Sequence, residues 1–214
     1  MPGFTTGVCV NENVYKFIDL SIVISFTMCT HNNVIRIPIE AQDVLNLACK
    51  IGDAHLVQRL LDDGVDVQAD NNRALMLGCL HGNADVVQLL LNAGADIHAD
   101  DHDAFMVACV NGNDAIVKLF LDAGVDANTQ DNLALFYACQ HGRDKVVELL
   151  LDAGADLHTQ DNLGLMNACF YGHESVVKIL LDAGADVNAR DGMATKITRV
   201  QGFTSIAELL LRGT

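Results

Sequence analysis

The chain has 214 residues and half of them are apolar, so it holds ample material for a hydrophobic core. Its 13 basic and 28 acidic residues give a formal net charge of −15, which argues against direct binding to a nucleic acid backbone or to anionic lipid. It has no tryptophan, only two prolines, and no uninterrupted apolar run of about 20 residues that could span a membrane.

The first forty residues have a pattern of their own. From Ile18 to Met28 apolar and polar residues alternate, and residues 35–39 repeat the alternation after a turn at 30–33. A period of two predicts half-buried β-strands. We therefore expect residues 1–40 to form a small antiparallel β-hairpin or meander that caps the segment after it. A dimer contact through residues 17–39 and a degenerate helical unit are the alternatives.

From residue 41 onward the chain repeats itself every 30 residues. Self-similarity at a fixed period indicates a stacked repeat array. Five full units are expected at 41–70, 71–100, 101–130, 131–160 and 161–190, with a degenerate capping unit at 191–214. The repeat is marked by glycines at 52, 82, 112, 142, 172 and 202, by glycines at 64, 94, 124, 154 and 184, and by cysteines at 49, 79, 109, 139 and 169.

One unit, residues 131–160, predicts two helices. A short first helix covers Ala134–Cys139 and ends at Gly142, because glycine adopts the left-handed conformation easily. The second helix runs from about Asp144 to Ala153 with a broad apolar face. A helix pair of this kind cannot bury both of its apolar sides alone, so stacking is required, and the expected fold is a mainly α solenoid.

The recurrent polar residues of the unit do not form a catalytic or metal site. In-register cysteines on stacked helices are too far apart for disulfides and lack metal-ligand spacing, so we expect small buried thiols. The aspartate of each Gly-Ala-Asp or Gly-Val-Asp sequence, as at Asp156, is expected to satisfy backbone donors in a turn. His81 and His141 are two units apart and cannot form a dyad. Reduced cysteines and the lack of a secretory signal pattern favour a cytoplasmic location.

The units resemble ankyrin repeats. The sequence LLLDAGAD, followed by a hydrophobic residue and by His158, has close copies that end at His98 and Asn188. The Ala-Cys-x-x-Gly sequence of the first helix is similar to the Ala-Ala-x-x-Gly step of the family. Ankyrin units usually have about 33 residues, and the shorter period implies short β-hairpin fingers. The family's Thr-Pro-Leu-His opening is absent. Short units of this kind resemble the ankyrin repeats of giant DNA viruses.

The resemblance implies a non-catalytic protein–protein interaction module without a cofactor, in which the concave face of the array binds a partner protein. A viral or effector-type adaptor is the narrower form of this expectation, and the acidity favours a basic partner. The alternatives are a scaffold that self-assembles through the N-terminal β element and an acidic mimic of nucleic acid. The position-by-position resemblance predicts that a partner contacts Lys50, Ile51, Arg73, Leu80, His81, His102, Val110, Asn111, Asn132, Leu133, Gln140, His141, Asn162, Leu163, Phe170 and Tyr171.

Family resemblance also implies that hairpin positions such as Asn128 and Asn188 could be hydroxylated, although a role in the turn is the simpler expectation. Within unit 131–160, Asn132, Leu133, Gln140 and His141 are interpreted as the variable positions. Any specific function of this unit is therefore expected at those four positions.

Overall fold

The computed structural model describes residues 25–30, 33–38 and 40–212. Strands β1 (Ser25–Thr30) and β2 (Asn33–Pro38) pair antiparallel, with Ser25 opposite Pro38 and Thr30 opposite Asn33. Most of the β element expected for residues 1–40 lies outside the described residues. Its role as a cap or as an association surface therefore stays a prediction.

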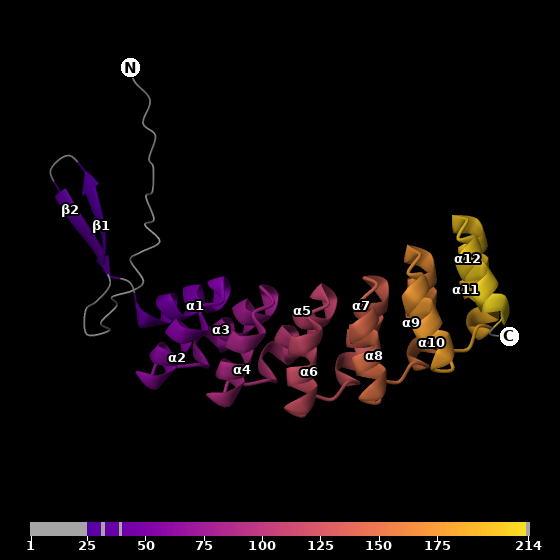
Figure 1. The fold of residues 1–214 in the computed structure, drawn as a ribbon, viewed down its shortest axis with the longest axis horizontal. Helices are drawn as coiled ribbons and strands as arrows, with labels where there is room; N and C mark the ends of the chain where they lie inside the picture. The colour runs from indigo at the N-terminus through magenta and orange to yellow at the C-terminus, as the bar shows by residue number, and fades with distance from the viewer. Residues whose placement is uncertain (1–24, 31–32, 39, 213–214) are drawn as a thin grey trace, which may run out of the picture.

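Residues 40–212 form a solenoid of six stacked helix pairs, which confirms the predicted fold class (Figure 1). A 3₁₀-helix, η2 (Ala99–His102), precedes α5. The twelve α-helices of this part of the chain are α1 (Ala41–Ile51), α2 (Ala54–Asp62), α3 (Ala69–Leu80), α4 (Ala84–Asn92), α5 (Asp103–Asn111), α6 (Asp114–Asp122), α7 (Thr129–Gln140), α8 (Asp144–Asp152), α9 (Thr159–Tyr171), α10 (Glu174–Asp182), α11 (Ala189–Gln201) and α12 (Thr204–Arg212).

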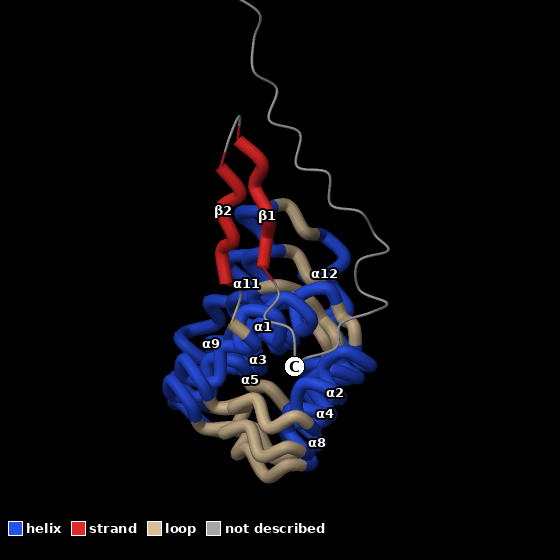
Figure 2. Tube along the Cα trace, turned by 90° about the vertical axis from the view of Figure 1, so that its left-hand side faces the viewer, coloured by secondary structure: helices blue, strands red, loops and turns tan. Residues whose placement is uncertain are grey.

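The helices are arranged in two rows. The odd-numbered first helices pack on one another along one side, and the even-numbered second helices pack along the other (Figure 2). Between the rows lies a continuous core, to which each second helix from α2 to α10 contributes two residues in sequence and a third one turn later, as Val146, Val147 and Leu150 show. Helix α12 contributes Ile206 and Leu210. The Ala-Cys pairs of α1, α5, α7 and α9 are fully buried, as is Cys79 of α3, and such small side chains let neighbouring helices approach closely.

A left-handed turn joins successive units where β-hairpin fingers were expected. No strand occurs within residues 40–212. Instead, Asp70, Asn71 and Asn72 have φ angles of 51°, 55° and 56°. Residues 130–132 and 190–192 repeat this conformation. A unit three residues shorter than usual leaves too little chain for a hairpin, and a single left-handed turn reverses it instead. Asn, Asp and Gly recur there because they tolerate positive φ best.

Four units also cap the first helix of the unit before them. The residue immediately before each of α4, α6, α8 and α10 reaches back with its side chain to a carbonyl at the end of the preceding first helix, where helical partners run out. The donors and distances are Asn83 Nδ2 to Cys49 O at 2.8 Å, Asn113 Nδ2 to Cys79 O at 2.9 Å, Arg143 Nε to Val110 O at 2.8 Å and His173 Nε2 to Gln140 O at 2.9 Å. These bonds fix the spacing and rotation of neighbouring units.

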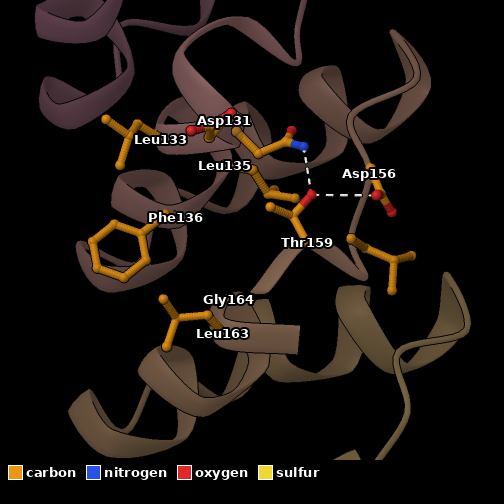
Figure 3. Close-up of a pocket in the computed structure, with 10 residues that line it drawn as sticks. Asp131, Leu133, Leu135, Phe136, Asp156, Thr159, Leu163 and Gly164 are labelled. Carbon is orange, nitrogen blue, oxygen red and sulfur yellow. Dashed lines mark hydrogen bonds between the residues drawn. The ribbon is translucent and has the colours of Figure 1, made fainter. Parts of the chain in front are cut away.

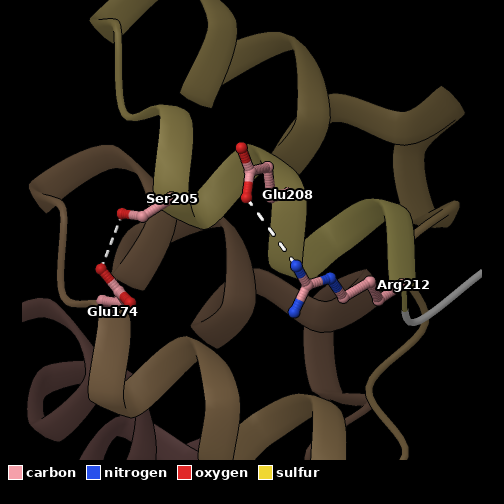
Figure 4. A network of polar contacts seen from close by, with 4 residues as sticks. All are labelled: Glu174, Ser205, Glu208 and Arg212. Carbon is pink, nitrogen blue, oxygen red and sulfur yellow. Dashed lines mark hydrogen bonds and ion pairs between the residues drawn. The ribbon is translucent and has the colours of Figure 1, made fainter.

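The last helix pair carries a polar residue inside the stack, although a terminal unit needs polar residues only on its outer face. Thr198, which replaces the usual alanine, is fully buried, and its hydroxyl donates to Thr195 O at 3.0 Å. The next residue, Arg199, is exposed. Helix α12 is held to α10 by Ser205, whose Oγ lies 2.6 Å from Glu174 Oε2, and carries the exposed pair Arg212–Glu208 at 3.9 Å (Figure 4).

Candidate partner-binding surface

We call the glycine that follows each first helix (Gly52, Gly82, Gly112, Gly142, Gly172 and Gly202) the inner glycine of its unit. Two residues at the end of every first helix directly precede this glycine. We call residues 50–51, 80–81, 110–111, 140–141, 170–171 and 200–201 the helix-end row. Most large exposed apolar side chains of the described chain belong to it, namely Ile51 at 54%, Leu80 at 49%, Phe170 at 48%, Tyr171 at 48% and Val200 at 87% exposure. Their concentration along one row indicates an interaction surface, since a surface that only faces solvent does not need exposed apolar side chains in one place.

The backbone of the helix-end row is held rigidly. Carbonyl oxygens of row residues accept hydrogen bonds from the next unit, as from Arg143 to Val110 O and from His173 to Gln140 O. Within the row, Asn111 Nδ2 lies 3.4 Å from Leu80 O. A side chain on such a backbone loses little further backbone freedom when a partner binds.

Aromatic residues gather at the C-terminal part of the row. The rings of Phe170 and Tyr171 meet edge to face with centroids 5.0 Å apart, and Tyr171 stacks on His173 at 6.3 Å. Gln140 Nε2 lies 3.4 Å from the Tyr171 hydroxyl oxygen and links this group to the preceding unit. Aromatic side chains held in place and half exposed are typical anchors of protein interfaces.

The remaining sequence-predicted contact residues of the row are polar or less exposed. Lys50, His81, Asn111 and His141 are exposed, whereas Val110 and Gln140 are half-buried. Val200 extends the row into the last unit, although the sequence analysis did not include it. Its position, 30 residues after Phe170, was the available signal, but the degenerate character of that unit hid it.

The predicted contact residues from the unit-joining turns do not form one surface. Arg73 is exposed, while Leu133 and Leu163 are half-buried. His102 is also half-buried, and its Nε2 lies 2.8 Å from His98 Nδ1. Asn132 and Asn162 are only 6% and 5% exposed, so their predicted contact with a partner is wrong as a surface contact. The left-handed turn, in which Asn132 and Asn162 have φ angles of 64° and 60°, directs both side chains into the stack.

The turn residues use the buried asparagines to join units. Asn72 Oδ1 accepts from Asp96 N at 2.7 Å, and Asn162 Oδ1 accepts from Asp186 N at 3.1 Å. Each aspartate of the Gly-x-Asp sequences also accepts from a backbone N–H two residues later, as at Asp156 Oδ1 and His158 N at 2.9 Å. The predicted role of these aspartates as turn residues is therefore confirmed.

A small cavity opens between α7 and α9, beside the turn that joins the two units (Figure 3). Its volume is about 100 Å³. Apolar walls are formed by Leu133, Phe136 and Leu163, and the polar residues Asn132 and Asp156 also line it. We call it the α7–α9 cavity. It is far smaller than the roughly 300–1,000 Å³ typical of small-molecule sites.

The described residues offer little for covalent or metal chemistry. No group of three or more His, Cys, Asp or Glu residues within the described part of the chain is placed to hold a metal ion. Burial raises the pKa of the Cys49, Cys79, Cys139 and Cys169 thiols to about 12, and that of Cys109 further. These thiols stay protonated at neutral pH and are poor nucleophiles. None of the helices in the described residues is long and apolar enough to cross a membrane.

These features define a helical repeat protein in which antiparallel helix pairs of 30 residues stack through glycine turns and a buried Ala-Cys step. The sequence matches the family described as ankyrin repeats (3 copies) over residues 9–101 and 105–191. The chain belongs to the ankyrin repeat family. The match begins ahead of Ala41, where the first described helix pair starts. A comparison with curated proteins finds no match.

Several solved structures share this fold. An ankyrin repeat domain from Acinetobacter baumannii AYE is 27% identical with a TM-score of 0.68, covering 80% of this chain and 98% of that one. The human ASB11 ankyrin repeat domain is 24% identical with a TM-score of 0.68 and coverages of 79% and 82%. The ankyrin repeat domain of Bcl-3, a member of the IkappaB family, is 25% identical with a TM-score of 0.67 and coverages of 79% and 85%.

Ankyrin repeats are generally protein–protein interaction modules, and the fold is typically a non-catalytic scaffold. Membership of the family therefore points to binding of other proteins.

Proposed function

We propose that this protein binds a partner protein through the helix-end row, with Phe170 and Tyr171 as the principal anchors. The observation that carries the proposal is the concentration of exposed apolar side chains along a row whose backbone is hydrogen-bonded from unit to unit. A rigid strip of apolar and aromatic side chains suits a partner that contributes an apolar surface of its own.

The charge of the chain narrows the partner. With 28 acidic and 13 basic residues, the chain attracts a protein with a basic surface and repels acidic ones. In its narrowest form, the proposal is a cytoplasmic adaptor of the viral or effector type, which holds a host protein without modifying it.

Affinity capture with a paired variant tests the proposal. We expect Phe170→Ala combined with Tyr171→Ala to reduce the capture of a partner at least about tenfold, because aromatic anchors commonly dominate interface energies. The partner is identified by mass spectrometry with the wild-type chain and then titrated against both proteins. Circular dichroism should show unchanged helix content, since both side chains are half exposed and outside the core.

A matched control variant removes exposed apolar side chains outside the helix-end row. Met193 and Leu211 are 39% and 59% exposed and lie off the helix-end row. Met193→Ala combined with Leu211→Ala should leave capture unchanged. Equal losses with the two pairs would show that general apolar stickiness, rather than the row, retains the partner.

A second candidate function is self-assembly through the N-terminal β element. A two-stranded hairpin is marginal by itself and its edges can pair with a second copy. Light scattering on the purified chain separates this candidate from the first, because a strict monomer at all concentrations excludes it.

A further inference from the structure

Two histidines meet at the turn that joins the second and third units. His98 directly precedes η2 and His102 is its last residue. His98 Nδ1 lies 2.8 Å from His102 Nε2, and the two rings meet edge to face with centroids 4.8 Å apart. The other units lack this pair, because the equivalent positions hold Gln68 with Asn72, Asn128 with Asn132, His158 with Asn162, and Asn188 with Gly192. The fold common to all units therefore does not require it.

The hydrogen bond on the far side of the His102 ring determines which nitrogen faces His98. His102 Nδ1 lies 3.3 Å from Thr129 Oγ1. One unit later, the equivalent contact is made by Asn132 Nδ2, which donates to Thr159 Oγ1 at 2.8 Å. The same arrangement at His102 has Nδ1–H donating to Thr129, so Nε2 presents a lone pair to His98. A metal-binding histidine has these two features, a free lone pair on one nitrogen and a hydrogen bond from the other that orients the ring.

The distance between the two facing nitrogens suits a pair of ligands on one metal ion. Imidazole nitrogens bind at about 2.0–2.1 Å, so two of them on one ion lie about 2.9 Å apart at a right angle and about 3.4 Å apart at a tetrahedral angle. The observed 2.8 Å is close to the first value. Right angles between ligands are typical of Ni²⁺ and Cu²⁺, and imidazole is a preferred ligand of both.

A cation from solvent can reach this turn and is favoured there by charge. His98 is exposed and His102 is half-buried. Asp96 Oδ1 accepts from the backbone N–H of His98 at 2.9 Å, and Asp100 Oδ1 accepts from Asn71 Nδ2 at 3.2 Å, which holds two carboxylates in the same loop. Residues 74–117 contain six aspartates and no lysine or arginine. The negative potential of such a segment raises the local concentration of cations.

We infer that His98 and His102 bind a divalent transition-metal ion of the Ni²⁺ or Cu²⁺ type, with water at its remaining positions. The ion replaces the proton that now lies between the two nitrogens. His98 then keeps its ring proton on Nε2, and His102 keeps its own on Nδ1 toward Thr129. The described chain has no group of three or more candidate ligands, so this two-histidine site is an exchangeable one at the surface. The inference does not depend on the helix-end row.

A titration of the full chain with NiCl₂ tests the inference. Calorimetry measures the affinity and the stoichiometry, and ¹⁵N NMR locates the ion because paramagnetic Ni²⁺ broadens the signals of nearby amides. We expect one saturable site, with broadening that begins in residues 95–103. MgCl₂ is the control for binding by carboxylates alone, because Mg²⁺ prefers oxygen ligands. It should not produce the localised effect.

Variants that borrow residues from other units show whether both histidines are needed. His98→Asn introduces the residue found at Asn128, and His102→Asn introduces the residue found at Asn72, so the turn accommodates both. Each should weaken Ni²⁺ binding at least about tenfold, because even the loss of a ligand's hydrogen-bond partner commonly costs that much. The matched control is His158→Asn, which removes a histidine at the position equivalent to His98 and should leave the affinity unchanged.

Thr129 is expected to act as a positioning residue. Thr129→Ala should weaken Ni²⁺ binding by about tenfold, since the His102 ring loses the hydrogen bond that orients it. Thr129→Ser keeps the hydroxyl and should restore the affinity, which a loss of packing alone would not explain. Circular dichroism on all four variants checks that the helix content is unchanged.

Four results would overturn the inference. Either histidine variant binding Ni²⁺ as tightly as wild type would show that the two nitrogens do not share an ion. An equal loss with His158→Asn would show that histidines bind singly. The same localised effect with Mg²⁺ would assign the binding to carboxylates. The absence of saturable Ni²⁺ binding would leave the hydrogen bond between the histidines as the whole role of the pair.

Discussion

An inner glycine can be required for two reasons, a left-handed backbone and a close contact with the next unit. Gly172 has a φ of +76°, and a methyl group there would lie 2.8 Å from Cζ of Phe203 in the next unit. Gly202 has nearly the same φ, +77°, but no atom lies within 4 Å of its hypothetical Cβ. Alanine at Gly202 therefore tests only the destabilisation caused by a left-handed backbone, whereas alanine at Gly172 adds the destabilisation caused by a crowded contact.

We expect Gly202→Ala to lower the free energy of unfolding by about 1–2 kcal/mol, the usual cost of a left-handed conformation with a side chain. Gly172→Ala should cost about 1–3 kcal/mol more, because it also overpacks the contact with Phe203. Urea denaturation of both variants measures the difference. Measured against Phe203→Ala alone, Gly172→Ala should cost little more than Gly202→Ala does, because the crowded contact is then absent. If the two glycine variants are equally destabilised, the contact between units contributes nothing to the requirement for glycine.

The buried cysteines make the free energy of unfolding fall with rising pH in the alkaline range. Burial raises the pKa of the Cys139 thiol from 9.0 to about 12, so above pH 9 the unfolded chain loses a proton that the folded chain keeps. The stabilising effect is complete below pH 9 and is lost as the pH rises toward 12. We expect a loss of up to about 1.4 kcal/mol per pH unit for each such cysteine.

Urea denaturation at pH 8, 9 and 10 measures this slope. Cys139→Ala lowers stability at every pH but should make the fall between pH 9 and 10 shallower by the contribution of one thiol. Tyrosines and lysines also titrate in this range, but they are common to both proteins and cancel in the comparison. Parallel curves for wild type and variant would show that Cys139 does not titrate differently in the folded and unfolded chains.

At the scale of elements, the helices could be predicted from the sequence and the joining turns could not. The second helix expected from about Asp144 to Ala153 agrees with α8 (Asp144–Asp152), because its apolar spacing and its glycine end are local signals. The left-handed turn also has a local signal, the run Asp70-Asn71-Asn72. The resemblance to a family with β-hairpins at this place directed the interpretation toward fingers instead.

The burial of Asn162 and the cavity at Gly164 depend on longer-range contacts. Asn162 is a polar residue in a variable position, and only the backbone N–H of Asp186, 24 residues later, explains why it is inside. Glycine in place of alanine at 164 can be seen in the sequence. By contrast, Asn132 Oδ1 is buried without a hydrogen bond because the backbone N–H of Asp156 donates to Asn128 instead. The aromatic pair 170–171 was found from the sequence because its exposure follows from position in the repeat alone.

At the scale of the whole molecule, the array is a one-dimensional chain of contacts. Each first helix packs on the first helices of its neighbours and each second helix on the second helices of its neighbours. Stability is then a sum of terms for each unit and for each interface between units. A central unit has two such interfaces, whereas the last unit, α11 and α12, has only one.

This difference predicts how a core defect spreads. Leu150 and Leu210 occupy the equivalent position of α8 and α12, and both are fully buried. Replacing either by alanine should cost about 2–5 kcal/mol locally. We expect Leu210→Ala to accelerate hydrogen exchange in α11 and α12 and leave α1–α6 unchanged, because the end unit can open without breaking the other interfaces. Leu150→Ala should accelerate exchange on both sides, from α5 to α12, since its unit connects the two parts of the stack. Hydrogen exchange followed by mass spectrometry compares the two variants. If Leu210→Ala accelerates exchange evenly from α1 to α12, the array unfolds as one cooperative block and its interfaces are stronger than the units they join.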